Sequence, residues 1–362
     1  MPERHAMAGT RALREEQQQD ALRARVDAVL QEFTQRESAE FVAVDAELLP
    51  VAEQLAAAVA GGKRLRAAFC YWGWRAGGQP DSDALVKAAA AIELVHAAAV
   101  VHDDLIDESS VRHGRPTAHI ALRSACAGRA RSTAGGRSLA MLAGDLLMSW
   151  AGQLFTSCGL PAAYLARARG LWAVMARELI AGECLEILRT GGRPDTASSL
   201  QVIRYKTAKY TVEHPLHIGG ALAGVPDSVM KAFTAYGLPL GEAFQLRDDL
   251  LGLFGDPART GKANLDDISG NRPTALLART WSAATAAERA ELDGLLGRSD
   301  LDDDALLRMR AIMQRTGAPA RVEEMINRRT REAVDAIGRA DLPACAADAL
   351  LHLVASAAAR QS

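Results

Sequence analysis

Apolar residues recur along most of the chain at the three- and four-residue spacing of an amphipathic α-helix. Runs of β-branched residues bounded by turn signals, which would predict strands, are almost absent. The helices predicted from this spacing cover residues 21–33, 83–101, 139–155, 171–188 and 236–254. Short clusters of glycine, proline and polar residues separate them. The pattern therefore predicts an all-α fold, a single-domain bundle of long apolar helices.

Composition narrows the range of partners and compartments. Residues 1–20 are polar and predict a flexible tail, which leaves residues 21–362 as the domain. The 42 Lys and Arg nearly balance the 44 Asp and Glu, and a net charge of −2 argues against a nucleic acid partner. The five cysteines are scattered, no apolar signal peptide opens the chain, and Glu93 and His96 interrupt the longest apolar run. We expect a cytoplasmic protein with no transmembrane segment.

Two groups of aspartates end apolar helical stretches. In the first, Asp103 and Asp107 are four residues apart, with Asp104 beside them, so the carboxylates share a helix face. In the second, Asp248 and Asp249 follow Gln245 at the same kind of spacing. Either group alone could be a solvated helix end, but two make that interpretation weaker. Carboxylates from two helices are hard oxygen ligands that suit Mg²⁺, whose remaining positions go to water and phosphate.

Cations lie close to these acids in the sequence. The chain has only six lysines, and four of them fall in short basic patches. The patches are residues 61–66 (GGKRLR), residues 112–115 (RHGR), residues 206–209 (KTAK) and Gly261-Lys262. Ammonium and guanidinium groups are good phosphate donors, so the patches together predict diphosphate ligands.

These motifs, taken in order, resemble the trans-isoprenyl diphosphate synthase (polyprenyl synthetase) family, and geranylgeranyl diphosphate synthases in particular. Residues 103–107 (DDLID) match the family's first aspartate-rich motif in full. The other matching segments are residues 61–66, 93–96, 112–119, 206–208, 244–249, 255–257, 260–262 and 270–274. The resemblance implies the isoprenoid synthase fold, with helices around a central cavity, and a homodimer.

The resemblance also implies an activity. A Mg²⁺-dependent prenyltransferase would condense isopentenyl diphosphate head-to-tail with an allylic diphosphate (DMAPP, GPP or FPP) to give a trans-polyprenyl diphosphate. Three Mg²⁺ ions would be held by Asp103, Asp104, Asp107, Asp248 and Asp249. The allylic diphosphate would contact Arg112, Lys206 and Lys262, and isopentenyl diphosphate would contact Lys63, Arg66, His96 and His113. Lys206, Thr207 and Gln245 would be the catalytic residues near the developing allylic cation.

The chain departs from the family pattern at several positions. His113 stands where the family has a second arginine, Glu186 replaces a shorter aspartate, and Gly252 replaces a third acid of the second motif. Arg272 replaces a usual lysine. The departure at His113 predicts weaker and pH-dependent binding of isopentenyl diphosphate, and the departures together predict reduced activity rather than a different fold.

Small residues precede the first acidic motif and bear on product length. In the family, large side chains at the positions of Ala98 and Ala99 close the elongation pocket, so two alanines predict an open passage. Met148 and Phe155 on the next long helix are candidates for its floor. The prediction is geranylgeranyl diphosphate (C20), with longer products as the alternative.

Two other functions stay open from the sequence. A class I terpene cyclase would keep the first acidic motif, but it normally lacks the second and the cations at Lys63 and Arg66. A catalytically weak subunit of a heteromeric synthase would bind prenyl diphosphates without efficient turnover, and His113, Glu186 and Gly252 are the residues that favour it.

Overall fold

The structure is a computed structural model that describes residues 2–112, 114–126, 128, 132–255, 270–298 and 300–358. The chain forms two compact units. The N-terminal unit contains residues up to 168 together with 218–224, and the C-terminal unit contains residues 169–217 and those from 225 onward. Helices α7 (Ala162–Arg189) and α9 (His214–Ala223) contribute residues to both.

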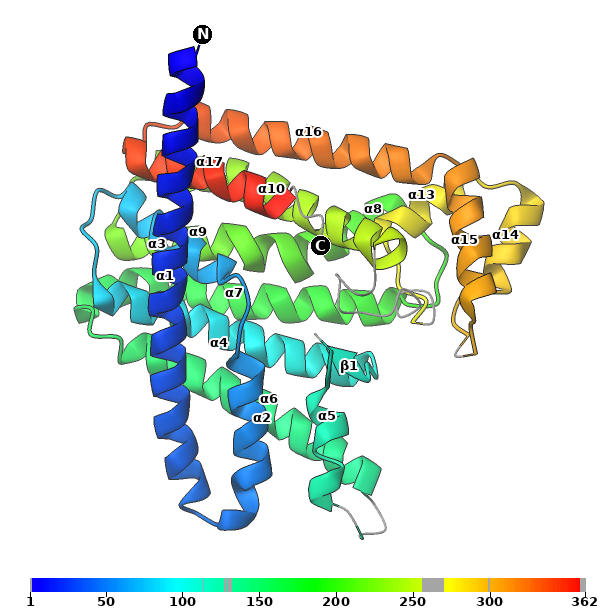
Figure 1. Ribbon diagram of the computed structural model, residues 1–362, viewed down its shortest axis with the longest axis horizontal. Helices are drawn as coiled ribbons and strands as arrows, with labels where there is room; N and C mark the ends of the chain where they lie inside the picture. The colour runs from blue at the N-terminus through cyan, green and yellow to red at the C-terminus, as the bar shows by residue number, and fades with distance from the viewer. Residues whose placement is uncertain are drawn as a thin grey trace. The chain divides into compact units, whose positions relative to one another are not determined.

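The N-terminal unit is built around α4 (Asp83–Ile106) and α6 (Ser132–Thr156), which pack along each other (Figure 1). Ser82 caps the start of α4 by accepting a hydrogen bond from the Leu85 N–H. Most of the helix is alanine, valine, isoleucine and leucine, and most of these residues are buried. The remaining elements are α1 (Pro2–Val42), η1 (Ala46–Leu48), α2 (Leu49–Val59), α3 (Leu65–Ala76), β1 (Val111–Arg112), β2 (Arg115–Pro116), α5 (Ala118–Ala121) and η2 (Ser124–Cys126).

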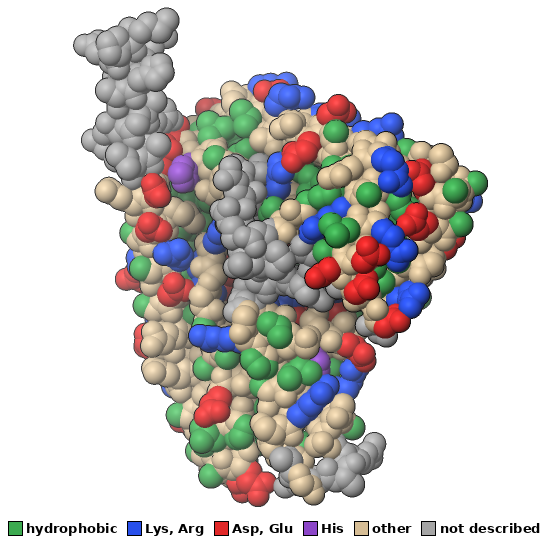
Figure 2. Space-filling model, turned by 45° about the vertical axis from the view of Figure 1, so that its right-hand side comes forward, with side chains coloured by type: hydrophobic (Ala, Val, Ile, Leu, Met, Phe, Trp, Pro, Cys, Tyr) green, Lys and Arg blue, Asp and Glu red, His purple; other side chains and the backbone are tan. Residues whose placement is uncertain are grey.

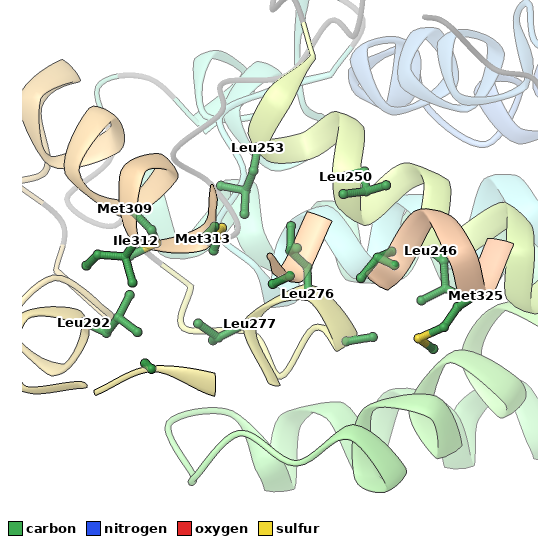
Figure 3. Close-up of a cluster of buried hydrophobic side chains, with 14 of the residues drawn as sticks. Leu246, Leu250, Leu253, Leu276, Leu277, Leu292, Met309, Ile312, Met313 and Met325 are labelled. Atoms are coloured by element: carbon green, nitrogen blue, oxygen red, sulfur yellow. The ribbon is translucent and has the colours of Figure 1, made fainter. Parts of the chain in front are cut away.

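The C-terminal unit is organised by α10 (Asp227–Phe254), which packs against α16 (Ala318–Arg339), α17 (Ala344–Ala358) and η3 (Ile203–Glu213). Leu246, Leu250 and Leu253 recur on one side of α10 and join a buried cluster with α13 (Ala275–Ala283) and α15 (Asp303–Arg315) (Figure 3). Burying one such leucine contributes about 1.5–3 kcal/mol. The unit also contains α8 (Thr196–Val202) and α14 (Ala286–Asp293).

Segment η3 is a π-helix of 11 residues, a rare form that occurs mostly in short pieces and often at functional sites. Two glycines allow neighbouring helices to approach its backbone closely. A Cβ on Gly182 of α7 would lie 2.3 Å from the backbone nitrogen of Lys206. A Cβ on Gly241 of α10 would lie 2.4 Å from the Ala208 Cα. Residues 206–208 are therefore held by backbone contacts on two helices.

The predicted all-α class is confirmed, since the strands of the described residues are one two-residue pair, with Arg112 opposite Arg115. The boundary predicted at residue 20 falls inside α1, which continues from Pro2 to Val42. The alanine, leucine, arginine and glutamate in this stretch have high helix propensities.

Helix α4 is long and apolar enough to cross a membrane by length and composition, and among the described helices no other passes that test. However, 72% of its apolar window is buried within the protein, as in a core helix. The face in Figure 2 has acidic and basic side chains interspersed, which agrees with the near-neutral net charge.

Candidate active site

The first acidic motif lies at the C-terminal end of α4. Asp103 and Asp107 are one turn apart, and the Asp107 N–H donates to the Asp103 carbonyl over 2.8 Å. Asp103 and Asp107 are half-buried, whereas the Asp104 side chain is buried. The motif therefore separates two accessible carboxylates from one that faces the protein.

Arg112 on β1 binds that buried carboxylate. Its Nε donates to both oxygens of Asp104, over 2.8 and 2.9 Å, and its Nη2 lies 3.2 Å from Asp103 Oδ2. Burial alone would lower the pKa of Arg112, but the hydrogen bonds to Asp104 and the nearby carboxylate charges outweigh it and raise the pKa. The guanidinium is therefore a fixed positive charge beside the motif.

The second acidic motif lies on α10 and is linked to η3 by hydrogen bonds. Asp248 is half-buried and Asp249 is buried. The Gln245 amide donates to Asp249 Oδ1 over 3.0 Å, and the Thr207 hydroxyl donates to Gln245 Oε1 over 2.9 Å. The structure thus brings together Thr207, Gln245 and Asp249, three of the residues predicted for the site.

Lys206, the neighbour of Thr207, is paired with acids on α7. Its Nζ lies 2.8 Å from Glu183 Oε2 and also contacts Glu186. The longer side chain noted at position 186 therefore reaches the lysine that the sequence predicts to bind a diphosphate. An incoming anion would have to compete with these two carboxylates for the same ammonium.

A second ionic cluster lies on the following residues of η3 and on α9. Lys209 is 3.1 Å from both Glu178 and Glu213, and His214 Nε2 is 2.7 Å from Glu178 Oε2. Burial lowers the pKa of His214 despite its acidic neighbours. Burial would raise the pKa of Glu178, but hydrogen bonds from His214 and Lys209 lower it overall. The cluster ties three elements of the C-terminal unit together.

The sequence profile of the polyprenyl synthetase family matches residues 50–313. The chain belongs to the polyprenyl synthetase family. Among its relatives, a (2E,6E)-farnesyl diphosphate synthase of Mycobacterium tuberculosis is 31% identical over 289 residues, which is 78% of this chain and 75% of that protein. A geranylgeranyl diphosphate synthase of Saccharolobus solfataricus is 31% identical over 260 residues, 71% of this chain and 74% of that protein.

Solved structures give the same fold. A geranylgeranyl pyrophosphate synthase from Corynebacterium glutamicum, solved in complex with isoprenyl diphosphate and magnesium, superposes with a TM-score of 0.89 at 31% identity. The match covers 93% of this chain and 98% of that one. The predicted isoprenoid synthase fold is therefore confirmed, and the chain is a trans-prenyl diphosphate synthase by family. Relatives that make products from farnesyl to nonaprenyl diphosphate match at similar identity, so family membership leaves the product length open.

The residues predicted to bind isopentenyl diphosphate lie in the N-terminal unit of this synthase. Lys63 is exposed in the loop between α2 and α3, Arg66 is half-buried in the first turn of α3, and His96 is half-buried on α4. His113, like Lys262 of the predicted allylic site, lies outside the described residues.

The register of α4 against α6 bears on the prediction of product length. Glu108 accepts a hydrogen bond from Arg137, and a Cβ on Gly144 would meet the His102 ring at 2.2 Å, so the two helices are antiparallel. Continuing this register by one turn brings Ala98 and Ala99 level with Met148. Phe155 lies seven residues, or about 10 Å, further along α6. Ala98 and Phe155 are buried, while Ala99 and Met148 are half-buried.

Sequence reasoning missed Arg64 and Glu93, although both lie within matching motifs. Arg64 was one of three neighbouring cations in a flexible turn, yet its side chain is only 8% exposed. Glu93 is 3% exposed. Glu93 itself was the sequence signal that could have revealed this pairing, since a glutamate inside an alanine- and valine-rich helix needs a polar or charged partner.

Proposed function

We propose that the protein condenses isopentenyl diphosphate head-to-tail with an allylic diphosphate to give geranylgeranyl diphosphate. The observation that carries this proposal lies at the end of α4, where the buried Asp104 binds Arg112 with both oxygens and Asp103 and Asp107 are half-buried one turn apart. The bound ligands named for the Corynebacterium glutamicum enzyme, isoprenyl diphosphate and magnesium, support the same chemistry.

The donor set fits Mg²⁺, because all five members are carboxylates on or at the end of helices and three of the five are only half-buried. Asp103 and Asp107 would hold ions from the first motif, and Asp248 would hold a third from the second. Bound Mg²⁺ would neutralise charge on the leaving diphosphate. The count of three ions is part of this proposal.

The chain's own residues would act around that diphosphate. As the allylic C–O bond breaks, its electron pair leaves with the diphosphate, and Arg112 and Lys206 would stabilise that negative charge. Thr207 and Gln245 would present oxygen dipoles toward the allylic cation. A new C–C bond then forms to isopentenyl diphosphate, whose C2 proton would leave with the departing diphosphate. Apolar walls on α4 would exclude water from the cation.

Small side chains support a C20 product. Ala98 and Ala99 are level with Met148, the ring of the nearby Trp150 packs on Phe33 of α1, and Phe155 comes about 10 Å further along α6. We propose that the growing chain passes these alanines and ends near Phe155. Exposed apolar side chains on α6 (Met141 and Leu142) and on α7 (Ile187 and Leu188) support the proposed homodimer. The burial of α4 supports a protein of the aqueous cytoplasm.

The test is incubation of the purified protein with Mg²⁺, isopentenyl diphosphate and each of the C5, C10 and C15 allylic diphosphates, with products separated by chromatography. We expect a C20 product, and Ala99→Phe should shorten it, with Ala99→Val as the smaller control. An unchanged product length in Ala99→Phe would place the growing chain elsewhere. No elongation of any substrate would favour the weakly active subunit, and a cyclic hydrocarbon would favour the cyclase.

A further inference from the structure

The loop between α2 and α3 contains an arginine in a strained conformation. Gly61 and Gly62 have φ values of 72° and 99°, in the left-handed region that glycine tolerates. Arg64 has a φ of 51°, which a residue with a Cβ adopts only when its surroundings enforce it. Lys63 beside it is exposed, whereas the Arg64 side chain is buried.

The Arg64 guanidinium connects the loop to three helices. Its Nε donates to Asp27 Oδ1 on α1 over 2.7 Å, and its Nη2 donates to the Val59 carbonyl at the end of α2 over 2.6 Å. Its Nη1 lies 4.0 Å from Glu93 Oε2 on α4. Since these groups belong to separate segments, the side chain fixes the backbone of the loop from inside the protein.

Glu93 fixes the other end of the same segment. Its Oε1 accepts a hydrogen bond of 2.9 Å from the Ala67 N–H, one of the backbone donors left open at the start of α3. One buried carboxylate thus faces Arg64 with one oxygen and holds the first turn of α3 with the other. The segment between these two attachments contains Arg66, and Lys63 immediately precedes it. His96 lies one turn beyond Glu93 on α4.

We propose that Arg64, Glu93 and Asp27 are positioning residues for isopentenyl diphosphate. They hold Lys63 and Arg66 in a fixed arrangement beside the turn of α4 that carries His96. This inference rests on the proposed function and on the resemblance to the family, which implies that those three side chains bind that diphosphate. A loop ordered before binding loses less conformational entropy when the ligand arrives.

Stability alone is a poor reason for this arrangement. A buried ion pair contributes little compared with an apolar pair of similar volume, because desolvating the charges is costly. The left-handed backbone at Arg64 adds a further cost. Both costs are accounted for if the network sets the geometry of the adjacent cations.

The same unit offers a matched control. Arg25 lies two residues before Asp27 on α1 and bonds to Asp81 and Asp83 over 2.9 and 2.7 Å. That tie also joins α1 to a later segment, but it is exposed and contacts no part of the loop. Arg25→Gln therefore removes an α1 ion pair without disturbing Arg64.

The experiment compares Arg64→Gln, Arg64→Lys, Glu93→Gln, Asp27→Asn and Arg25→Gln in the full-length protein. We expect Arg64→Gln to raise KM for isopentenyl diphosphate by about tenfold, while KM for the allylic diphosphate and kcat change less than about twofold. Arg64→Lys and Asp27→Asn should fall between Arg64→Gln and the wild type. Arg25→Gln should match the wild type, and a double Asp27→Asn, Arg64→Gln variant should be no worse than Arg64→Gln.

Two results would overturn the inference: an unchanged KM for isopentenyl diphosphate, or a parallel rise in both KM values with loss of thermal stability. If Glu93→Gln fails to fold, Asp27→Asn still tests the network, because Asp27 is 42% exposed. If the wild type turns over no substrate, calorimetric titration with isopentenyl diphosphate separates the two proposals. Weaker binding by Arg64→Gln than by Arg25→Gln would keep the positioning role and reject the catalytic proposal, and equal binding would reject the positioning role.

Discussion

The two aspartate pairs of this synthase, Asp103-Asp104 and Asp248-Asp249, share a burial pattern but differ in the side chain that bonds the buried aspartate. In each pair the first carboxylate is half-buried, and the second is buried, with exposed fractions of 4% for Asp104 and 7% for Asp249. In each pair a neighbouring side chain bonds the buried member. The partner is charged in the first pair, Arg112, and neutral in the second, Gln245.

This difference indicates what each buried carboxylate does. Asp104 carries the counter-charge that orients Arg112, so its charge matters as much as its shape. Asp249 accepts from an amide that in turn accepts from Thr207, so its shape matters more than its charge. The accessible members, Asp103 and Asp248, are left for the proposed metal ions.

The largest effect should come from the accessible members. Asp103→Ala and Asp248→Ala should each lower turnover at least about a hundredfold, because each removes a ligand that neutralises the leaving group. Steady-state assays at saturating Mg²⁺ would measure this. Asp293→Ala, at an exposed position at the end of α14, is the control. Wild-type rates in either variant would remove that aspartate from the metal site.

Replacing each buried aspartate by asparagine, which removes the charge and keeps the shape, should affect the kinetics of the two pairs differently. Asp104→Asn leaves Arg112 with a weaker partner and should raise KM for the allylic diphosphate about tenfold. Asp249→Asn keeps an oxygen that accepts from Gln245 and should change kcat by about threefold or less. Equal effects in the two variants would contradict the distinction between a charged and a neutral partner.

The link to η3 should have a smaller effect that depends on the hydroxyl. Thr207→Val removes the donor to Gln245 and should lower kcat about fivefold, since a single neutral hydrogen bond contributes about 1 kcal/mol. Thr207→Ser keeps the donor and should behave like the wild type. If Thr207→Ser is as slow as Thr207→Val, the methyl group rather than the hydrogen bond is what matters.

Acid should weaken the ionic cluster of Lys209, Glu178 and His214 on η3, α7 and α9. The folded chain lowers the pKa of His214, mainly by burial, below its usual value of about 6.5. Protonation thus favours the unfolded form as pH falls through about 6.5, and the stability present above that pH is lost. The raised pKa of Arg112 keeps its guanidinium protonated throughout this pH range.

Hydrogen exchange measured by mass spectrometry would test this sign. Peptides covering residues 203–217 should exchange faster at pH 5.5 than at pH 7.5, after correction for intrinsic rates, and peptides covering 100–106 should change less. His214→Gln should flatten the response of the first set. Faster exchange at the higher pH would contradict the assignment.

Sequence reasoning predicted the helices well because their periodicity is local. The acidic motifs were predicted at helix ends, and the structure places Asp107 as the residue that caps α4. The π-helical form of η3 was not predicted, since the spacing around Lys206 gives no sign of it. That form accompanies close backbone contacts from Gly182 and Gly241, which are distant in the sequence.

The roles of neighbouring cations were also beyond the sequence. Lys63, Arg64 and Arg66 look equivalent in a glycine-rich turn. Their difference arises because the Arg64 side chain is buried against Asp27 and Glu93, which lie 37 residues before and 29 residues after it. Pairing over such distances depends on how α1 and α4 pack.

The left-handed backbone at Arg64 has a consequence for anyone who engineers this enzyme for heat resistance. Among the described residues, three with a side chain have positive φ, namely Arg64, Glu108 and Asn271, and each lies in or directly beside a family motif. Glycine at such positions relieves backbone strain, so a stability screen that ignores function would favour it. At Arg64, however, glycine would also remove a charged partner of the buried Glu93, so the two effects on melting temperature oppose each other and this position belongs outside a thermostabilising library.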